Sequence, residues 1–203
     1  MTPAPDPRRH SPAAERNAAP ILAELQRLLP PSGLLLEIAS GTGQHAAVCS
    51  AGLPGWQWQP SDPQAEALDS ISAWCAGLAR VRAPLALDVL AAPWPVHEPV
   101  DAIFCANMIH IAPWPCTTAL MQGAARHLAP QGLLLTYGPY LETEVVTAPS
   151  NLAFDADLRA RDPAWGLRSL EQVAATAAAA GLELHQRIQM PANNLLLVWA
   201  FSS

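Results

Sequence analysis

The residues best suited to chemistry form a glycine-containing turn directly after an apolar run. Residues 34–38 are apolar apart from Glu37, and Ala39-Ser40-Gly41-Thr42-Gly43 follows at once. A short apolar run of this kind is typical of a buried parallel strand. Glycine lets the backbone approach a ligand where a Cβ atom would collide. We therefore expect a ligand beyond the carboxyl end of this strand, against Ala39, Gly41 and Gly43.

The carboxylate before the turn helps to identify that ligand. Residues 41–46 also fit a dinucleotide-binding pattern with alanine in the third glycine position. A dinucleotide would place its pyrophosphate at the start of the next helix, where Glu37 would repel it. S-adenosylmethionine (SAM) instead carries an ammonium and a sulfonium, which a carboxylate attracts. Glu37 thus favours SAM as the cofactor, and the alternative for this residue is capping of backbone amides.

Three later segments offer further cofactor-binding groups. Asp62 follows a predicted strand at residues 56–59. It is suited to accepting hydrogen bonds from ribose hydroxyls, or to capping a helix that opens with Pro63. Asp88 ends a third predicted strand and is placed to bind the adenine amino group, with Val89 against the ring, although an ordinary loop aspartate is the alternative. A fourth strand at residues 100–105 is expected to deliver Asn107 to the same site.

The elements that must position these residues alternate between apolar runs and amphipathic segments, as in α/β folds. A helix is expected near residues 21–29 with Pro20 in its first turn, and residues 182–190 and 195–201 predict an antiparallel hairpin. We predict one domain, residues 1–203, with a Rossmann-like α/β fold: a seven-stranded, mostly parallel sheet with an antiparallel last strand and helices on both faces. Residues 1–15 are expected to be a flexible lead-in, and residues 138–168 an insertion that covers the substrate.

Composition excludes several classes of protein. The chain has no lysine, which excludes Walker A loops, protein-kinase chemistry and lysine Schiff bases. Its net charge of −6 argues against non-specific nucleic-acid binding. Neither a membrane-spanning run nor a signal peptide is recognisable. We expect a cytoplasmic monomer or homodimer without a metal site, in which Cys49, Cys75, Cys105 and Cys116 are reduced and mostly buried.

In sequence order, several motifs resemble class I SAM-dependent methyltransferases. They are Glu37/Gly41/Gly43, Asp88/Trp94-Pro95, Asp101/Ile109-His110 and Leu128/Pro130/Gly132. A closer resemblance, over nearly the whole chain, is to the family of methyltransferase-like protein 26, a domain of unknown function. It is carried by Arg16-Asn17, residues 58–62, 107–110 and 137–140, and residues 190–194.

The resemblance implies a class I methyltransferase fold and leaves the substrate unsettled. One departure concerns the ribose-binding acid, which in class I enzymes usually comes directly at the end of the second strand. Asp62 lies slightly later, so Gln59 or Ser61 could share its role. Arg16 and Asn17 are expected to fold over the cofactor from the N-terminal helix.

Methyl transfer requires an in-line acceptor atom, and an oxygen or nitrogen acceptor can also need a base. His110 is the best candidate for the general base, against the alternative of a structural histidine at a helix start. Tyr140 is the second catalytic candidate, against packing around Pro139. The candidate substrate-lining residues are Tyr137, Asn151, Phe154, Arg161, Trp165 and Asn193. For the arginines, internal salt bridges to nearby aspartates are the alternative.

We predict a SAM-dependent methyltransferase that acts on a small-molecule acceptor. One alternative is a non-catalytic module that binds SAM or a partner and forms no S-adenosylhomocysteine (SAH). Another is an NAD-dependent oxidoreductase, which should show a second domain or a Tyr-x-x-x-Lys pair, and the latter is impossible without lysine. We also expect Gly43→Asp to abolish SAM binding in a folded protein.

Overall fold

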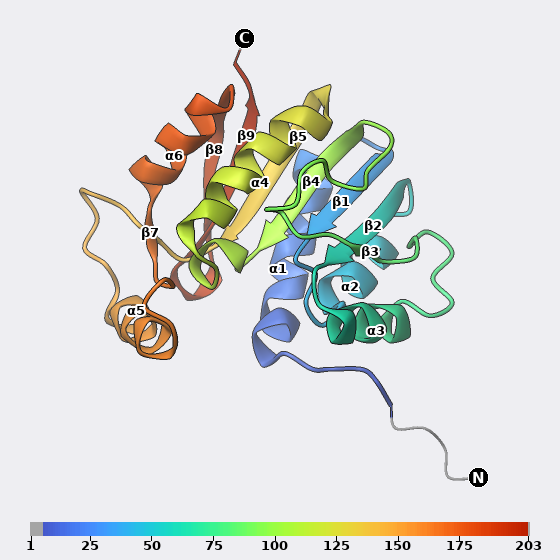
Figure 1. The fold of residues 1–203 in the computed structure, drawn as a ribbon, viewed down its shortest axis with the longest axis horizontal. Helices are drawn as coiled ribbons and strands as arrows, with labels where there is room; N and C mark the ends of the chain where they lie inside the picture. The colour runs from blue at the N-terminus through green and yellow to red at the C-terminus, as the bar shows by residue number, and fades with distance from the viewer. Residues whose placement is uncertain (1–5, 203) are drawn as a thin grey trace. The chain divides into compact units, whose positions relative to one another are not determined.

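The computed structural model describes residues 6–202, which form two compact units with their boundary between Asp88 and Val89 (Figure 1). Each unit contains helices and strands that follow one another along the chain. The prediction of a single domain over residues 1–203 stays a prediction.

The first unit is built on three parallel strands in the order β3-β2-β1. Leu35 of β1 lies opposite Trp58 of β2, and both are fully buried. The apolar run recognised in the sequence therefore forms the buried strand expected of it. The elements are α1 (Pro12–Leu28), β1 (Gly33–Ile38), α2 (Gln44–Gly52), β2 (Trp56–Asp62), α3 (Ala65–Trp74) and β3 (Leu85–Ala86).

Helix α1 begins earlier than the sequence suggested. Ser11 is its N-cap, with its Oγ accepting a hydrogen bond from the Ala14 amide at 3.2 Å, and Pro12 occupies the first turn. Residues 12–15 are thus helical, so the predicted flexible lead-in is too long; residues 1–5 lie outside the described part of the chain. Pro20 lies inside α1 rather than at its start, at a typical cost of about 3 kcal/mol. Burial of Ile21 and Leu25 offsets this cost.

Strand β2 is longer than predicted and ends at Asp62. Pro60 made the earlier end plausible, because proline cannot donate a hydrogen bond to a neighbouring strand. The ladder continues past it because Ser61 and Asp62 pair with Leu85 and Ala86 of β3. Asp62 is therefore the last residue of the second strand, and the expected departure from the class I pattern is wrong.

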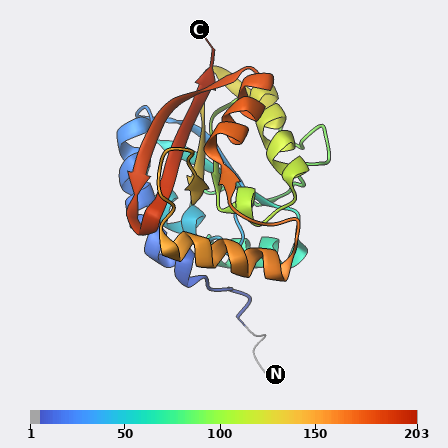
Figure 2. The same cartoon turned by 90° about the vertical axis from the view of Figure 1, so that its left-hand side faces the viewer.

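The second unit contributes four strands in the order β4-β5-β9-β8. β4 and β5 are parallel, whereas β9 runs antiparallel to both β5 and β8. Helices α4 and α6 lie side by side on one face of β8 and β9 (Figure 2). The elements are β4 (Val100–Ala106), the 3-10 helix η1 (Met108–His110), α4 (Trp114–His127), β5 (Leu128–Gly138), β6 (Tyr140–Leu141), α5 (Pro149–Arg161), β7 (Arg168–Ser169), α6 (Leu170–Ala179), β8 (Leu182–Met190), the 3-10 helix η2 (Pro191–Asn193) and β9 (Asn194–Phe201).

The segment predicted as an insertion has structure of its own. β6 and β7 form a separate two-stranded parallel pair, and α5 lies between them in the sequence. Figure 2 shows α5 across the end of the sheet at which β8 turns into β9. The side chain of Asn151 on α5 donates to the carbonyl of Asn193 in that turn, at 3.1 Å. This hydrogen bond fixes the insertion against the hairpin.

Over residues 6–202 the two units supply three and four strands to the predicted seven-stranded, mostly parallel sheet, and the α/β prediction is confirmed. The antiparallel hairpin at residues 182–201 is confirmed as well. None of the four cysteines forms a disulfide, and Cys49, Cys105 and Cys116 are buried. In this described range, no helix combines the length and the apolar character needed to cross a membrane.

Candidate active site

The glycine turn of the first unit is held in a conformation that few residues adopt. Ala39, Gly41 and Gly43 have φ values of 54°, 58° and 89°. The amide of Ser40 donates to the Ser61 carbonyl at 2.8 Å, and the Gly43 amide donates to the Ser40 carbonyl at 3.0 Å. A turn with three left-handed residues persists only where its surroundings fix it. Its hydrogen bonds to the end of β2 supply that constraint.

The two glycines of the turn have different surroundings. A Cβ atom on Gly43 would lie 2.7 Å from the Cα atom of Ile71, so this glycine is required for packing against α3. A Cβ on Gly41 would have only the Ala39 carbonyl oxygen nearby, at 4.0 Å. We therefore expect Gly43→Asp to disturb this packing, so the variant does not separate loss of SAM binding from loss of stability. Gly41 is the position at which space lies open above the turn.

Asp62 connects the end of β2 to the glycine turn. Its Oδ2 accepts a hydrogen bond from the Gly41 amide at 3.0 Å, and its Oδ1 accepts one from the Gln64 amide at 3.0 Å. Helix α3 has Gln64 as its N-cap, so the reading of Asp62 as the cap is wrong. Each carboxylate oxygen has a second lone pair. The ribose-binding role of Asp62 stays a prediction.

Glu37 lies at the base of the turn and is 1% exposed. Its Oε2 accepts a hydrogen bond from the Trp58 indole at 2.9 Å, and its Oε1 lies 4.0 Å from Nδ1 of His45. Burial raises the pKa of Glu37 to about 7, against the opposing effect of the Trp58 hydrogen bond. These contacts are to side chains and favour a role in positioning the turn, while attraction of a SAM cation by Glu37 stays a prediction.

Glu37→Gln is expected to change the pH dependence of stability. The pKa of Glu37 is raised from 4.5 to about 7 in the folded state, so folding holds its proton more tightly. Its contribution is fully present below pH 4.5 and is lost as the pH rises to about 7, a loss of roughly 3 kcal/mol at most. In urea titrations, the variant should match the wild type near pH 4.5 and exceed it at pH 8.

The difference between the two proteins isolates Glu37 from the buried histidines. His45 and His110 have pKa values lowered from 6.5 to about 4 by burial, so they remove stability as the pH falls from 6.5 to 4. Because both proteins carry these histidines, their effect cancels in the comparison. A stability difference that is the same at pH 4.5 and pH 8 would contradict the role assigned to Glu37.

The N-terminal segment is attached to the same turn. The Ser11 amide donates to the Gln44 side chain at 2.6 Å, and the Arg9 amide donates to Ser70 Oγ at 2.8 Å. Arg16 is exposed and Asn17 is half-buried on the α1 helix that follows. Asp88, at the end of this unit, is exposed. Cofactor contacts by Arg16, Asn17 and Asp88 stay predictions.

In the second unit, the Pro93-Trp94-Pro95 segment holds Val89 in place. The Trp94 indole donates to the Val89 carbonyl at 3.1 Å, and its ring stacks on His127 with centroids 5.1 Å apart. A Cβ on Gly123 would lie 2.0 Å from the Trp94 ring, so glycine in α4 makes room for it. This packing leaves Val89 buried. Its contact with adenine stays a prediction.

Asn107 links β4 to η1 in a left-handed conformation, with φ of 65°. Asparagine tolerates this region better than most residues. Its amide donates to the Tyr137 carbonyl at 2.8 Å, which ties the end of β4 to the end of β5. The side chain is half-buried, and a role in cofactor binding stays a prediction.

His110 is enclosed by parts of the second unit. It is 3% exposed, its ring meets Phe154 edge-on with centroids 5.6 Å apart, and a Cβ on Gly138 would lie 2.8 Å from its Cε1. Burial, and then the charge of Arg168, lower the pKa of His110 to about 4. The imidazole is therefore neutral at pH 7, the state in which it can accept a proton.

Arg168 and Gly166 hold the backbone around His110. The Gly166 amide donates to the His110 carbonyl at 3.0 Å. The Arg168 guanidinium donates to the carbonyls of Ile109, Ala112 and Ala164 at 3.2, 2.8 and 2.7 Å. The sequence reasoning missed Arg168, because no local pattern distinguishes an arginine that binds carbonyls from a solvated one.

His110→Gln is expected to lower methyl transfer about 100-fold or more, the usual contribution of a general base. SAH affinity should stay the same, because the change removes a proton acceptor and not a cofactor contact. In the wild type, kcat/KM should decline only near pH 4, where His110 becomes protonated. Full activity in the variant, or a decline centred near pH 6.5, would exclude His110 as the base.

Tyr140 does not have the environment of an acid or base. Its hydroxyl donates to Thr136 Oγ1 at 3.0 Å, and the Trp199 indole donates to the same oxygen at 3.0 Å. Burial raises the pKa of Tyr140 well above its usual value. The prediction that Tyr140 is catalytic is therefore replaced by a packing role, since the hydroxyl points into the core. Tyr137 is buried as well.

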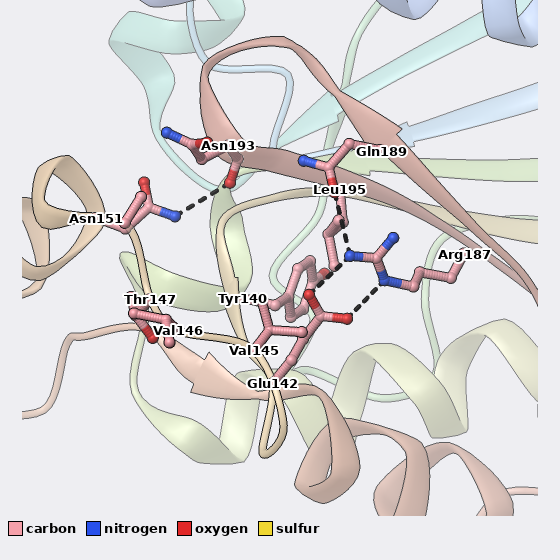
Figure 3. A pocket seen from close by; sticks show the side chains of 11 residues that line it. Tyr140, Glu142, Val145, Val146, Thr147, Asn151, Arg187, Gln189, Asn193 and Leu195 are labelled. Atoms are coloured by element: carbon pink, nitrogen blue, oxygen red, sulfur yellow. Dashed lines mark hydrogen bonds and ion pairs between the residues drawn. The ribbon is translucent and has the colours of Figure 1, made fainter.

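A pocket in the second unit gathers some of the predicted substrate residues (Figure 3). Asn151 and Asn193 line it, together with Tyr140, which the sequence predicted to be catalytic. Phe154 contacts His110 instead. Arg161 lies over the Trp165 ring at 5.3 Å and 3.8 Å from Asp157, so the salt-bridge alternative holds for this arginine. The sequence reasoning missed three polar residues of the pocket, Glu142, Arg187 and Gln189.

Solved methyltransferase structures resemble the chain over most of its length. The mitomycin 7-O-methyltransferase matches with a TM-score of 0.81 and 15% identity, over 94% of this chain and 54% of that one. An O-methyltransferase family 2 protein from Planctomyces limnophilus, in complex with apigenin, matches with a TM-score of 0.78 and 22% identity. The match covers 93% of this chain and 59% of that one. Human N-acetylserotonin methyltransferase, in complex with SAM, matches with a TM-score of 0.77 and 15% identity. The match covers 92% of this chain and 52% of that one.

The chain thus spans little more than half the length of these proteins. At such identities the likeness shows the fold, which is that of the SAM-dependent methyltransferases and agrees with the fold class predicted from the sequence. A family model described as a protein of unknown function, DUF938, matches residues 8–200. The chain belongs to this family.

Proposed function

We propose that the protein is a SAM-dependent methyltransferase that acts on a small-molecule acceptor. The observation that carries the proposal is the hydrogen bond from the Gly41 amide to Asp62, which joins a left-handed glycine turn to an acidic residue at the end of β2. Open space where a Cβ of Gly41 would lie supports the close approach of a cofactor to this backbone.

The first unit would hold SAM through the backbone of Ala39, Gly41 and Gly43, through Asp62 at the ribose and through Asp88 at the adenine. The cofactor contacts expected of Val89 and Asn107, which belong to the second unit, stay predictions. When bound, SAM supplies a methyl group activated by its sulfonium. Neutral His110 would accept the proton that an oxygen or nitrogen acceptor loses.

A non-catalytic SAM-binding module is the second candidate, and the burial of His110 favours it. His110 is only 3% exposed, and the Tyr140 hydroxyl is bonded to Thr136. Positioning and desolvation can support methyl transfer without a base, so this burial does not by itself remove the catalytic proposal.

Methyl-labelled SAM distinguishes the two candidates. The protein is incubated with labelled SAM and a small-molecule extract from which macromolecules have been filtered, and both SAH and labelled products are measured. We expect labelled small molecules and SAH in equal amounts, and neither with Asp62→Ala. SAH binding without any labelled product at saturating SAM would support the binding module instead.

Three further expectations accompany this proposal. They are membership of the methyltransferase-like protein 26 family, a cytoplasmic location, and a monomeric or homodimeric state without nucleic-acid partners. The family resemblance is supported by the match to a family of unknown function along residues 8–200.

A further inference from the structure

The pocket beside α5 has a cavity volume of about 170 Å³, which suits a compact small molecule better than a polymer. One wall is the segment from Tyr140 to Asn151, and the other comes from β8, the turn after it, and the start of β9 (Figure 3). Its apolar lining comes from the Tyr140 ring, Val145, Val146 and Leu195. Both walls of the pocket therefore offer apolar surface to a ligand.

The charged residues of the pocket neutralise each other. Arg187 donates to Glu142 through Nε at 2.5 Å and through Nη2 at 2.8 Å, a two-pronged ion pair. Nη2 also donates to Gln189 Oε1 at 3.1 Å. The hydrogen bond to Glu142 raises the pKa of Arg187, so the guanidinium stays charged at neutral pH. With this pair closed, the pocket carries no net charge to attract an anion or a cation.

Three carboxamides provide most of the remaining polar lining, beside the Thr147 hydroxyl. They belong to Asn151, Gln189 and Asn193, and each contains both a donor and an acceptor. Asn151 and Asn193 are joined by the hydrogen bond from Asn151 Nδ2 to the Asn193 carbonyl. Carboxamides recognise uncharged polar groups such as hydroxyls, carbonyls and amides without requiring a charge on the ligand.

Two segments of the chain contribute both to the lining of the pocket and to the surroundings of His110. On α5, Asn151 and Phe154 are three residues apart and so share a helix face; Asn151 lines the pocket, and Phe154 contacts the His110 ring. On the other side, Gly138 packs against His110, and Tyr140, two residues later, lines the pocket. The lining of the pocket and the surroundings of His110 are thus built from the same two segments, although His110 itself does not line the pocket.

We propose that this pocket binds the methyl acceptor and selects an uncharged molecule that combines hydrogen-bonding groups with apolar surface. The statement that the ligand is the methyl acceptor rests on the proposed function. The statement that it is uncharged rests on the ion pair between Glu142 and Arg187. Acidic metabolites, phosphate esters and amines are disfavoured as ligands, because none finds an unpaired counter-charge in this pair.

Three matched phenols test the charge preference: 4-hydroxybenzamide, 4-hydroxybenzoate and 4-hydroxybenzylamine. Their binding to the full chain is measured by ligand-observed NMR, without cofactor and with saturating SAH. The wild type should bind the amide about tenfold more tightly than either charged phenol. Glu142→Gln should improve benzoate binding about tenfold, and Arg187→Gln should improve benzylamine binding to a similar degree.

Leu152→Gln is the matched control, because Leu152 is exposed on α5 and does not line the pocket; it should leave all three affinities unchanged. The proposal is overturned if the amide does not bind the wild type, if a charged phenol binds more tightly, or if neither charge variant alters the order. Failure of the proposed function can be told apart from failure of the pocket proposal. In that case SAH binding or methyl transfer would be absent, while the charge preference of the pocket would remain.

Discussion

Asp62→Ala is expected to weaken SAH binding about 100-fold while the protein stays folded. The change removes two charge-assisted hydrogen bonds to backbone amides, at Gly41 and Gln64, and each is typically worth about 1.5–3 kcal/mol. It also removes the proposed acceptor for the ribose hydroxyls. Calorimetric titration with SAH measures the affinity directly, and circular dichroism checks the fold.

Two further variants sharpen this test. Asp62→Asn keeps one side-chain oxygen for the Gly41 amide, so its affinity should lie between those of the wild type and the alanine variant. Asp69→Ala, an exposed aspartate on α3, is the matched control and should bind SAH as the wild type does. An Asp62→Ala protein with wild-type affinity would show that the end of β2 takes no part in cofactor binding.

Gly43→Ala is expected to lower the free energy of unfolding by about 2–5 kcal/mol. The residue has φ of 89°, where alanine is strained, and its Cβ would lie 2.7 Å from the backbone of Ile71. The close contact is not easily relieved, because the opposing atom is the Cα of Ile71 and not the end of a flexible side chain. Urea titration of the purified variant measures the loss.

Gly41→Asn separates packing from binding in the same turn. Asparagine tolerates a φ of 58°, and the space above Gly41 is open, so the variant should fold with nearly wild-type stability. Its side chain would occupy the space proposed for the cofactor, and SAH binding should fall about 100-fold or more. Equal stability of wild type and Gly43→Ala, or full SAH affinity in Gly41→Asn, would contradict the distinction drawn between the two glycines.

The sequence predicts the glycine turn and the strand before it because both depend on local patterns. An apolar run that ends in a positive-φ turn is visible without knowledge of distant residues. The sequence misplaces the start of α1 and the end of β2, because a proline stands at each expected boundary. In α1, the Ser11 cap and the burial of Ile21 and Leu25 outweigh Pro20. In β2, pairing with β3 extends the strand past Pro60.

The surroundings of the candidate side chains depend on contacts that local patterns do not encode. Tyr140 seemed available for chemistry by its place after a strand, yet its hydroxyl is bonded to Thr136, which also receives the Trp199 indole. Glu142 and Arg187 are 45 residues apart, and neither stands in a recognisable motif. Only the packing of the 140–151 segment against the β8–β9 hairpin brings them into one pocket.

The most direct test of the central claim is calorimetric titration of the wild-type protein with SAH and, in parallel, with NAD. The account predicts saturable SAH binding at one site per chain and no NAD binding, because SAM is the cofactor proposed for the turn between β1 and α2. Binding of NAD without binding of SAH would contradict the account and assign the glycine turn to a dinucleotide.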